Sequence, residues 1–88
     1  MEQLNRNLDT NSVADQLIEF LIDEILEDQM EVTSQDNLLL DVGVDSLGML
    51  RLVSFIEESF QLKIQPVQIT LENFQNVDVI SNFVIQSK

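Results

Sequence analysis

Apolar side chains recur at intervals of three and four residues along three stretches of this chain, and this spacing predicts three helices. In the first stretch, residues 13–29, apolar positions form one face and polar positions the opposite face. The apolar face consists of Leu17, Ile18, Leu21, Ile22 and Ile25, and the opposite face of Gln16, Glu19, Asp23 and Glu27. Ser12 and Asp15 have the spacing of a helix start signal, so the polar residues 1–11 are expected to be a loose leader.

The second stretch, residues 46–61, is strongly patterned as a helix. Its core-facing residues are Leu52, Val53, Ile56 and Phe60, with Met49 beside them. Leu47 and Leu50 lie one turn apart near the helix start and off this face. Leucines exposed at such a place are candidates for contact with a partner protein, although single leucines are also ordinary on protein surfaces.

The third stretch, residues 77–86, is rich in β-branched residues, which by propensity favour strands. Three apolar residues nevertheless fit one helical face: Ile80, Phe83 and Val84. Asn76 is a favoured N-cap residue, and Asp78 suits the positive end of a helix dipole. We therefore predict a helix here.

The first connection, residues 30–45, has turn-forming residues around an apolar cluster. A connection this long inside a small domain should have structure of its own, and we expect Leu38 and Val42 to fill the core between the helices. The apolar run 38–40 also fits a short strand, but the sequence offers it no evident partner strand.

The second connection begins with residues 62–69, which alternate like a strand but contain Pro66 and have no hairpin mate. Residues 70–74 are expected to form a short helical turn anchored by Phe74. The complete pattern predicts an all-α protein. It would be a small four-helix bundle, with three longer helices, one short helix and a long loop between helices 1 and 2, formed by residues 12–88.

Charge limits the partners that this protein can have. The formal net charge is −12, and no Lys or Arg lies between Arg6 and Arg51. Such a surface repels phosphate backbones and anionic lipid headgroups, so we expect no binding to nucleic acid or to membranes. It would attract basic patches on partner proteins, although acidic residues that only keep a small protein soluble would give the same composition.

The chain contains no cysteine and no histidine. This composition excludes disulfides, Ser-His-Asp and Cys-His catalytic groups, and zinc sites built from His or Cys. We therefore expect no catalytic residue, no metal site and no enzymatic activity of the chain alone. No stretch has the length of a membrane span or the pattern of a signal peptide, which, together with Met1, predicts a free-standing cytoplasmic chain, expected to be a monomer.

Ser46 lies in the first turn of the second predicted helix. Asp45 before it is a favoured N-cap residue, and Gly43 lets the preceding loop turn without a steric penalty. Backbone amides in a first helical turn have no intrahelical partner and lie at the positive end of the helix dipole, so a phosphate attached to the Ser46 hydroxyl would be well placed. Ser46 has no histidine to act as its base, so another protein would have to activate it.

Residues 40–47 read Leu-Asp-Val-Gly-Val-Asp-Ser-Leu and resemble the signature of acyl and peptidyl carrier proteins. Further matching residues are Leu52-Val53, Ile56-Glu57-Glu58, Phe60 and Ile64. The resemblance extends from about residue 12 to the end of the chain and implies a fourth helix at residues 77–86. It also implies that Ser46 carries covalent 4′-phosphopantetheine, which a phosphopantetheinyl transferase attaches from coenzyme A with magnesium.

The same resemblance implies that the thiol of the arm holds an acyl or aminoacyl group as a thioester, so the other partners would be enzymes that load or condense such groups. Asp45, Leu47, Leu50 and Arg51 surround the attachment site and are the expected partner-recognition residues.

Two positions depart from housekeeping fatty-acid carriers, which typically have an acidic residue after Asp-Ser-Leu and a glutamate three positions later. This chain has Gly48 and Arg51 there. A cation in place of an anion should weaken docking to basic partners, which favours a specialised pathway of the polyketide or nonribosomal-peptide type. Arg51 could instead only pair with a nearby surface carboxylate such as Asp41 or Asp45. The alternatives are a housekeeping fatty-acid carrier and an acidic helical interaction module without a prosthetic group.

Overall fold

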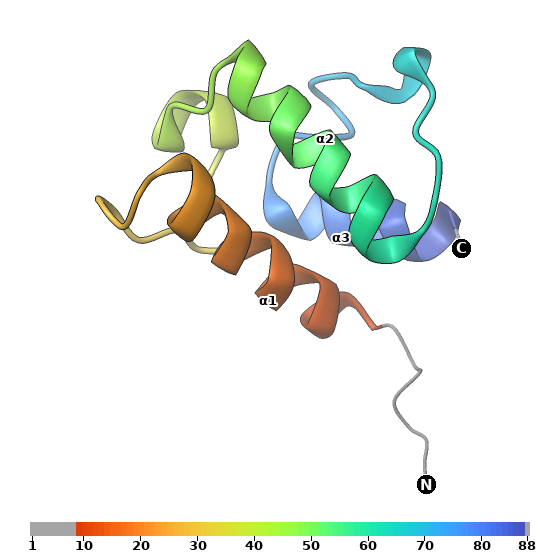
Figure 1. Cartoon of the computed structure of the whole chain (residues 1–88), viewed down its shortest axis with the longest axis horizontal. Helices are drawn as coiled ribbons and strands as arrows, with labels where there is room; N and C mark the ends of the chain where they lie inside the picture. The colour runs from red at the N-terminus through yellow and green to blue at the C-terminus, as the bar shows by residue number, and fades with distance from the viewer. Residues whose placement is uncertain (1–8, 88) are drawn as a thin grey trace, which may run out of the picture.

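The computed structural model describes residues 9–87, and these residues form helices and turns without a strand. The elements are α1 (Thr10–Phe20), η2 (Leu21–Ile25), η3 (Leu38–Val42), α2 (Ser46–Phe60), η4 (Pro66–Gln68) and α3 (Val77–Ser87). α1 and α2 lie side by side, and α3 passes behind α2 and packs against α1 (Figure 1). The predicted short helix is a single turn, closed by a hydrogen bond of 3.0 Å from the Phe74 amide to the Thr70 carbonyl. The predicted all-α bundle is therefore confirmed.

The first helix begins three residues before the predicted first residue, Val13. Asp9 is its N-cap, because its Oδ1 accepts a hydrogen bond of 2.8 Å from the Ser12 amide. Ser12 thus receives the cap instead of supplying it, and Thr10 and Asn11 belong to the helix and not to the expected leader. Residues 1–8, the rest of that leader, lie outside the described residues.

The first helix also ends earlier than the predicted Gln29. Its final turn, η2, widens, and the Leu26 amide donates to the Leu21 carbonyl at 2.8 Å, five residues back. Glu27 and Asp28 then adopt left-handed backbone conformations, with φ of 53° and 64°. Two successive left-handed residues cannot continue a right-handed helix, so the chain turns at this point.

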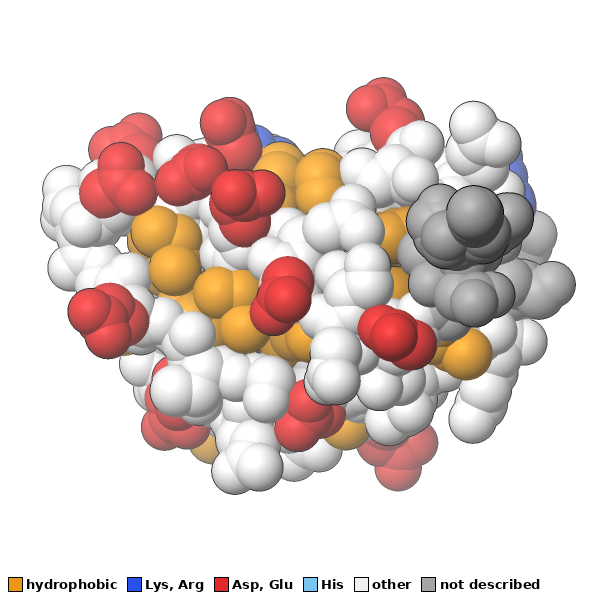
Figure 2. Space-filling view, turned by 90° about the horizontal axis from the view of Figure 1, so that it is seen from below, with side chains coloured by type: hydrophobic (Ala, Val, Ile, Leu, Met, Phe, Trp, Pro, Cys, Tyr) orange, Lys and Arg blue, Asp and Glu red, His pale blue; other side chains and the backbone are white. Residues whose placement is uncertain are grey.

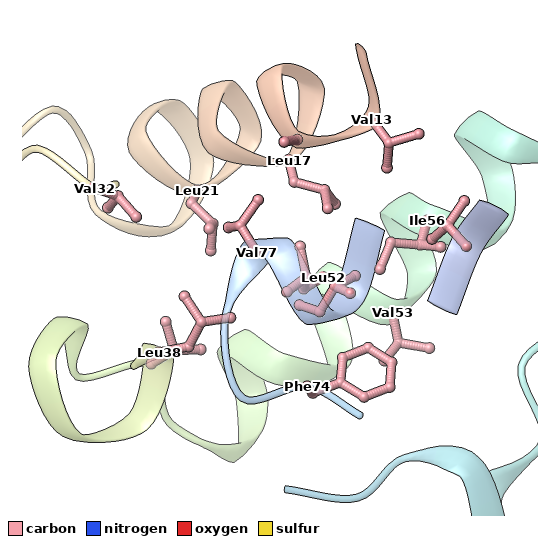
Figure 3. Close-up of a cluster of buried hydrophobic side chains, with 14 of the residues drawn as sticks. Val13, Leu17, Leu21, Val32, Leu38, Leu52, Val53, Ile56, Phe74 and Val77 are labelled. Carbon is pink, nitrogen blue, oxygen red and sulfur yellow. The ribbon is translucent and has the colours of Figure 1, made fainter. Parts of the chain in front are cut away.

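One apolar core joins all three long helices (Figure 3). The predicted faces are confirmed where Leu17 and Leu21 of α1, Leu52, Val53, Ile56 and Phe60 of α2, and Ile80 and Val84 of α3 are buried. Leu38 and Val42 of the first connection are buried too, as predicted. One polar side chain lies in this core: the Ser81 hydroxyl of α3 is fully buried and has no hydrogen-bond partner among residues 9–87.

The connections are held by hydrogen bonds of their own. Asn37 caps η3, because its Oδ1 accepts from the amides of Leu39 and Leu40 at 3.0 and 2.8 Å. The apolar run 38–40 is therefore a helical turn and not a strand. Residues 62–69 are not a strand either: the Ile64 amide donates to the Glu57 carboxylate at 2.8 Å, and η4 follows.

The first connection is also tied to the start of α3. The Leu38 amide donates to the Gln75 carbonyl at 2.9 Å, and the Asp78 amide donates to the Ser34 carbonyl at 3.0 Å. These two backbone hydrogen bonds, together with burial of Leu38, fix the loop that leads into α2.

Candidate functional site

Ser46 is the first residue of α2, and its side chain is exposed. The predicted cap is confirmed: Asp45 has extended backbone, and its Oδ1 accepts a hydrogen bond of 2.8 Å from the Gly48 amide. The Met49 amide donates to the Asp45 carbonyl at 2.8 Å. Among the described residues, the amides of Ser46 and Leu47 are then left without a hydrogen-bond partner at the positive end of the helix.

Gly43 sets the direction in which the loop enters this site. It ends η3 with φ of 84°, a left-handed conformation that costs glycine little and other residues more. The next residue, Val44, is 2% exposed, and its amide donates to the Leu38 carbonyl at 2.8 Å. Burial of Val44 anchors the chain two residues before Ser46, so the serine projects from a fixed point.

An apolar groove of about 730 Å³ begins beside Ser46. Its lining residues come from η3, the start of α2 and the turn before α3; the leucines among them are Leu39, Leu40, Leu50 and Leu71. These leucines are 50–80% exposed, so apolar surface faces solvent next to the serine. An exposed hydroxyl, two unpartnered amides and this adjoining groove fit a phosphate bearing a long, partly apolar arm.

The structure brings together only some of the predicted recognition residues. Asp45 and Leu50 line the groove with Ser46, whereas Leu47 is 68% exposed outside it. Sequence reasoning did not include Ile69 and Leu71, which reach the groove from more than twenty residues further along the chain. Their only signal in the sequence is that they are large apolar residues after Pro66, which pattern alone cannot assign to a site.

Arg51 pairs with a carboxylate other than the two expected ones. Its Nη2 is 3.7 Å from Glu24 Oε1 of η2, so Arg51 does pair with a nearby surface carboxylate, but with Glu24 instead of Asp41 or Asp45. Both side chains of this pair are about half exposed, 47% and 59%, and the pair is correspondingly weak.

Gly48 is buried where α2 passes close to η2. A Cβ at this position would lie 3.1 Å from Val44 Cγ1, 3.3 Å from Asp45 Oδ1 and 3.5 Å from Ile25 Cγ2. The glycine that departs from the fatty-acid-carrier pattern therefore allows close packing at the helix start.

The structure also bears on metal binding and on membrane insertion. Within residues 9–87, no group of three or more acidic, His or Cys side chains is arranged to hold a metal ion. No helix in the same part of the chain combines the length and apolarity needed to cross a membrane.

Comparison with known proteins identifies the family to which this chain belongs. Residues 15–84 match the family model described as a phosphopantetheine attachment site. The acyl carrier protein of Phytoplasma mali (strain AT) is 31% identical over 68 residues, which cover 77% of this chain and 79% of that protein. The aminoacyl carrier protein 1 of Bradyrhizobium diazoefficiens is 38% identical over 55 residues, or 62% of this chain and 60% of that protein.

A longer relative is the probable polyketide synthase 41 of Dictyostelium discoideum, which is 34% identical over 70 residues. The match covers 80% of this chain but only 3% of the synthase. Among solved structures, the crystal structure of acyl carrier protein from Thermotoga maritima matches with a TM-score of 0.73 and 20% sequence identity, covering 94% of both chains, and shows the same fold. By the family model and the relatives together, this chain belongs to the acyl carrier protein family, whose prosthetic group is 4′-phosphopantetheine.

Proposed function

We propose that this protein holds an acyl or aminoacyl group as a thioester on a 4′-phosphopantetheine attached to Ser46 and delivers it to partner enzymes. The observation that carries the proposal is the position of Ser46. Its hydroxyl is exposed at the start of α2, next to the N-cap residue Asp45 and inside the range matched by the phosphopantetheine-attachment family. The arm supplies the thiol that this cysteine-free chain lacks.

Loading requires a partner, because the chain has no histidine and Ser46 has no general base of its own. A phosphopantetheinyl transferase with magnesium would supply that base. The Ser46 oxygen would bond to the phosphorus next to pantetheine in coenzyme A, the diphosphate bond would break, and the adenosine bisphosphate would leave. The Ser46 proton would pass to the base on the transferase.

The residues around Ser46 are proposed to serve recognition. Asp45 fixes the helix start, Leu50 contributes apolar surface to the groove, and Leu47 is exposed outside it. A transferase or a condensing enzyme that reaches the serine must approach across these side chains. Arg51, held near Glu24, would present a cation on the adjoining face of α2.

A specialised pathway is favoured over housekeeping fatty-acid synthesis. Gly48 and Arg51 stand where fatty-acid carriers typically have acidic residues, and a partner with a basic docking surface would meet less negative charge there. Relatives named as a polyketide synthase and an aminoacyl carrier protein are consistent with such a pathway. Cytoplasmic location remains a prediction. Mass spectrometry of the protein purified from its native cells, with cargo attached, would identify the pathway.

The attachment is tested by incubating the protein with coenzyme A, magnesium and a broad-specificity transferase and measuring its intact mass. We expect a gain of one phosphopantetheine group in the unmodified protein. Ser46→Ala should abolish the gain, whereas Ser54→Ala, an exposed serine further along α2, should retain it. No gain in the unmodified protein, or a gain that survives Ser46→Ala, would overturn the proposal and favour an interaction module without a prosthetic group.

A further inference from the structure

Two aromatic rings stack at the seam between α1 and α2, away from the groove beside Ser46. The ring centroids of Phe20 and Phe55 are 4.3 Å apart with an interplanar angle of 17°. Both side chains are only half-buried, although they pack against the core. The pair therefore leaves aromatic surface in contact with solvent, outside the lining of the groove beside Ser46.

A hollow of about 270 Å³ opens over this pair. It is lined by Gln16, Glu19, Phe20, Asp23, Glu24 and Phe55. The hollow thus has an aromatic floor and a rim with three carboxylates. On the side of the molecule that α1 faces, acidic side chains surround patches of apolar surface (Figure 2).

Charge at the rim is only partly matched within the protein. Arg51 pairs with Glu24, at 3.7 Å, whereas Glu19 and Asp23 have no cation at ion-pair distance within residues 9–87. The surrounding sequence adds to this imbalance, because residues 9–31 contain eight acidic residues and no Lys or Arg. The local potential therefore favours a positively charged group.

We propose that the seam formed by Gln16, Glu19, Phe20, Asp23, Glu24 and Phe55 is a docking site for a basic segment of a partner protein. The stem of one Lys or Arg would lie on the Phe20–Phe55 pair, and its charged head would lie between Glu19 and Asp23. These two residue types combine an apolar stem with a cationic head, which matches an aromatic floor with a carboxylate rim. The hollow is small, so it accommodates a single side chain rather than a helix.

This seam is separate from the groove beside Ser46. No residue lines both hollows, since the groove uses Met49 and Leu50 of α2 and the seam uses Phe55. A partner bound at the seam would therefore leave Ser46 accessible. In this arrangement α1 contributes the acidic docking surface, and the start of α2, where Gly48 and Arg51 replace acidic residues, contributes the apolar one.

The test is a titration of the full, ¹⁵N-labelled chain with a synthetic amphipathic peptide of lysine and leucine, followed by NMR. We expect the largest shift changes at the amides of Glu19, Phe20, Asp23 and Phe55, and weaker binding as salt rises. The double variant Glu19→Gln/Asp23→Asn should weaken binding about fivefold, as expected for two partly exposed ion pairs. The same peptide with glutamate in place of lysine should not bind.

The matched control is Glu31→Gln/Glu58→Gln, which removes the same net charge from exposed positions outside both the seam and the groove beside Ser46. It should bind the lysine peptide with unchanged affinity. Equal weakening in both double variants would show that only net charge matters and would overturn the proposal, as would shift changes confined to other residues. Concentration-dependent shifts of the seam without peptide would assign it to a second copy of this chain and would also overturn the proposal. Ser46→Ala should bind the peptide normally, so this proposal and the carrier function can fail separately.

Discussion

Asp45 and Gly48 depend on each other at the start of α2. The Asp45 carboxylate accepts a hydrogen bond of 2.8 Å from the Gly48 amide, and the same oxygen would lie 3.3 Å from a Cβ at Gly48. The cap can therefore close tightly because the capped residue has no side chain. This relationship gives a structural reason for Gly48 that is independent of any partner.

Gly48→Glu should destabilise the protein by roughly 1–3 kcal/mol, the usual cost of forcing extra atoms into a packed site. The new side chain would displace Val44 or the Asp45 carboxylate. Urea denaturation measures the change in the free energy of unfolding. Ser54→Glu is the matched control, because it adds the same charge at an exposed position of the same helix. Equal stability of the two variants would contradict the packing argument.

Asp45→Ala should lower the free energy of unfolding by about 1 kcal/mol, because the helix loses its side-chain cap. Asp45→Asn keeps an oxygen that can accept from the Gly48 amide, so its cost should be a few tenths of a kcal/mol. Comparing these two variants also separates the role of Asp45 in capping the helix from a role in partner recognition. If transferase contact needs the Asp45 charge, both variants should load slowly, whereas normal loading of Asp45→Asn would restrict Asp45 to a structural role.

Ser81→Ala should stabilise the protein by about 1 kcal/mol, because it removes a buried hydroxyl that has no hydrogen-bond partner among residues 9–87. Alanine is also a better helix former than serine, which by itself adds stability. The control variant Ser87→Ala, in the same helix, measures part of this helix-propensity gain. Ser87 is exposed, although its hydroxyl donates to the Phe83 carbonyl at 2.8 Å. Thermal denaturation of both variants checks the difference, and a loss of stability in Ser81→Ala would refute it.

Arg51→Gln should change the free energy of unfolding by less than about 0.5 kcal/mol, since its ion pair with Glu24 is half exposed. Its effect should appear in docking instead: a transferase with a basic surface should load Arg51→Gln faster than the unmodified protein, most clearly at low salt. Glu24→Gln removes the other member of the pair and serves as the control for loss of the pair itself. Identical loading rates for all three proteins would argue against a role of Arg51 in recognition.

Added salt should raise the melting temperature, because it screens repulsion within a chain of net charge −12. Sodium chloride and magnesium chloride should both raise it. Differential scanning calorimetry gives the comparison. An unchanged melting temperature between low salt and millimolar magnesium would refute the repulsion argument.

Periodicity predicted the buried faces of α2 and α3, because those faces depend on spacing alone. Asp45 was predicted as a cap for the same reason: its interaction with Gly48 spans only three residues. The propensity of α3 for strand was overruled by packing against α1, where Ile80 and Val84 are buried.

Other features were not accessible from the sequence. The end of the first helix depends on left-handed Glu27 and Asp28, where no glycine marks the turn. The groove beside Ser46 requires Ile69 and Leu71, and the position of Arg51 requires Glu24. Each of these contacts joins separate elements, and only the packing of the bundle brings such residues together.

The hydrogen bonds from Leu38 to Gln75 and from Asp78 to Ser34 have a consequence for biosynthesis. The loop ahead of Ser46 reaches its final shape only when residues 75–78, which are synthesised after it, are available to it. Long-range pairing of this kind forms late. In a nascent chain that lacks α3, the loop before Ser46 therefore lacks its final conformation. A transferase that recognises the folded loop would therefore modify completed molecules and pass over truncated ones.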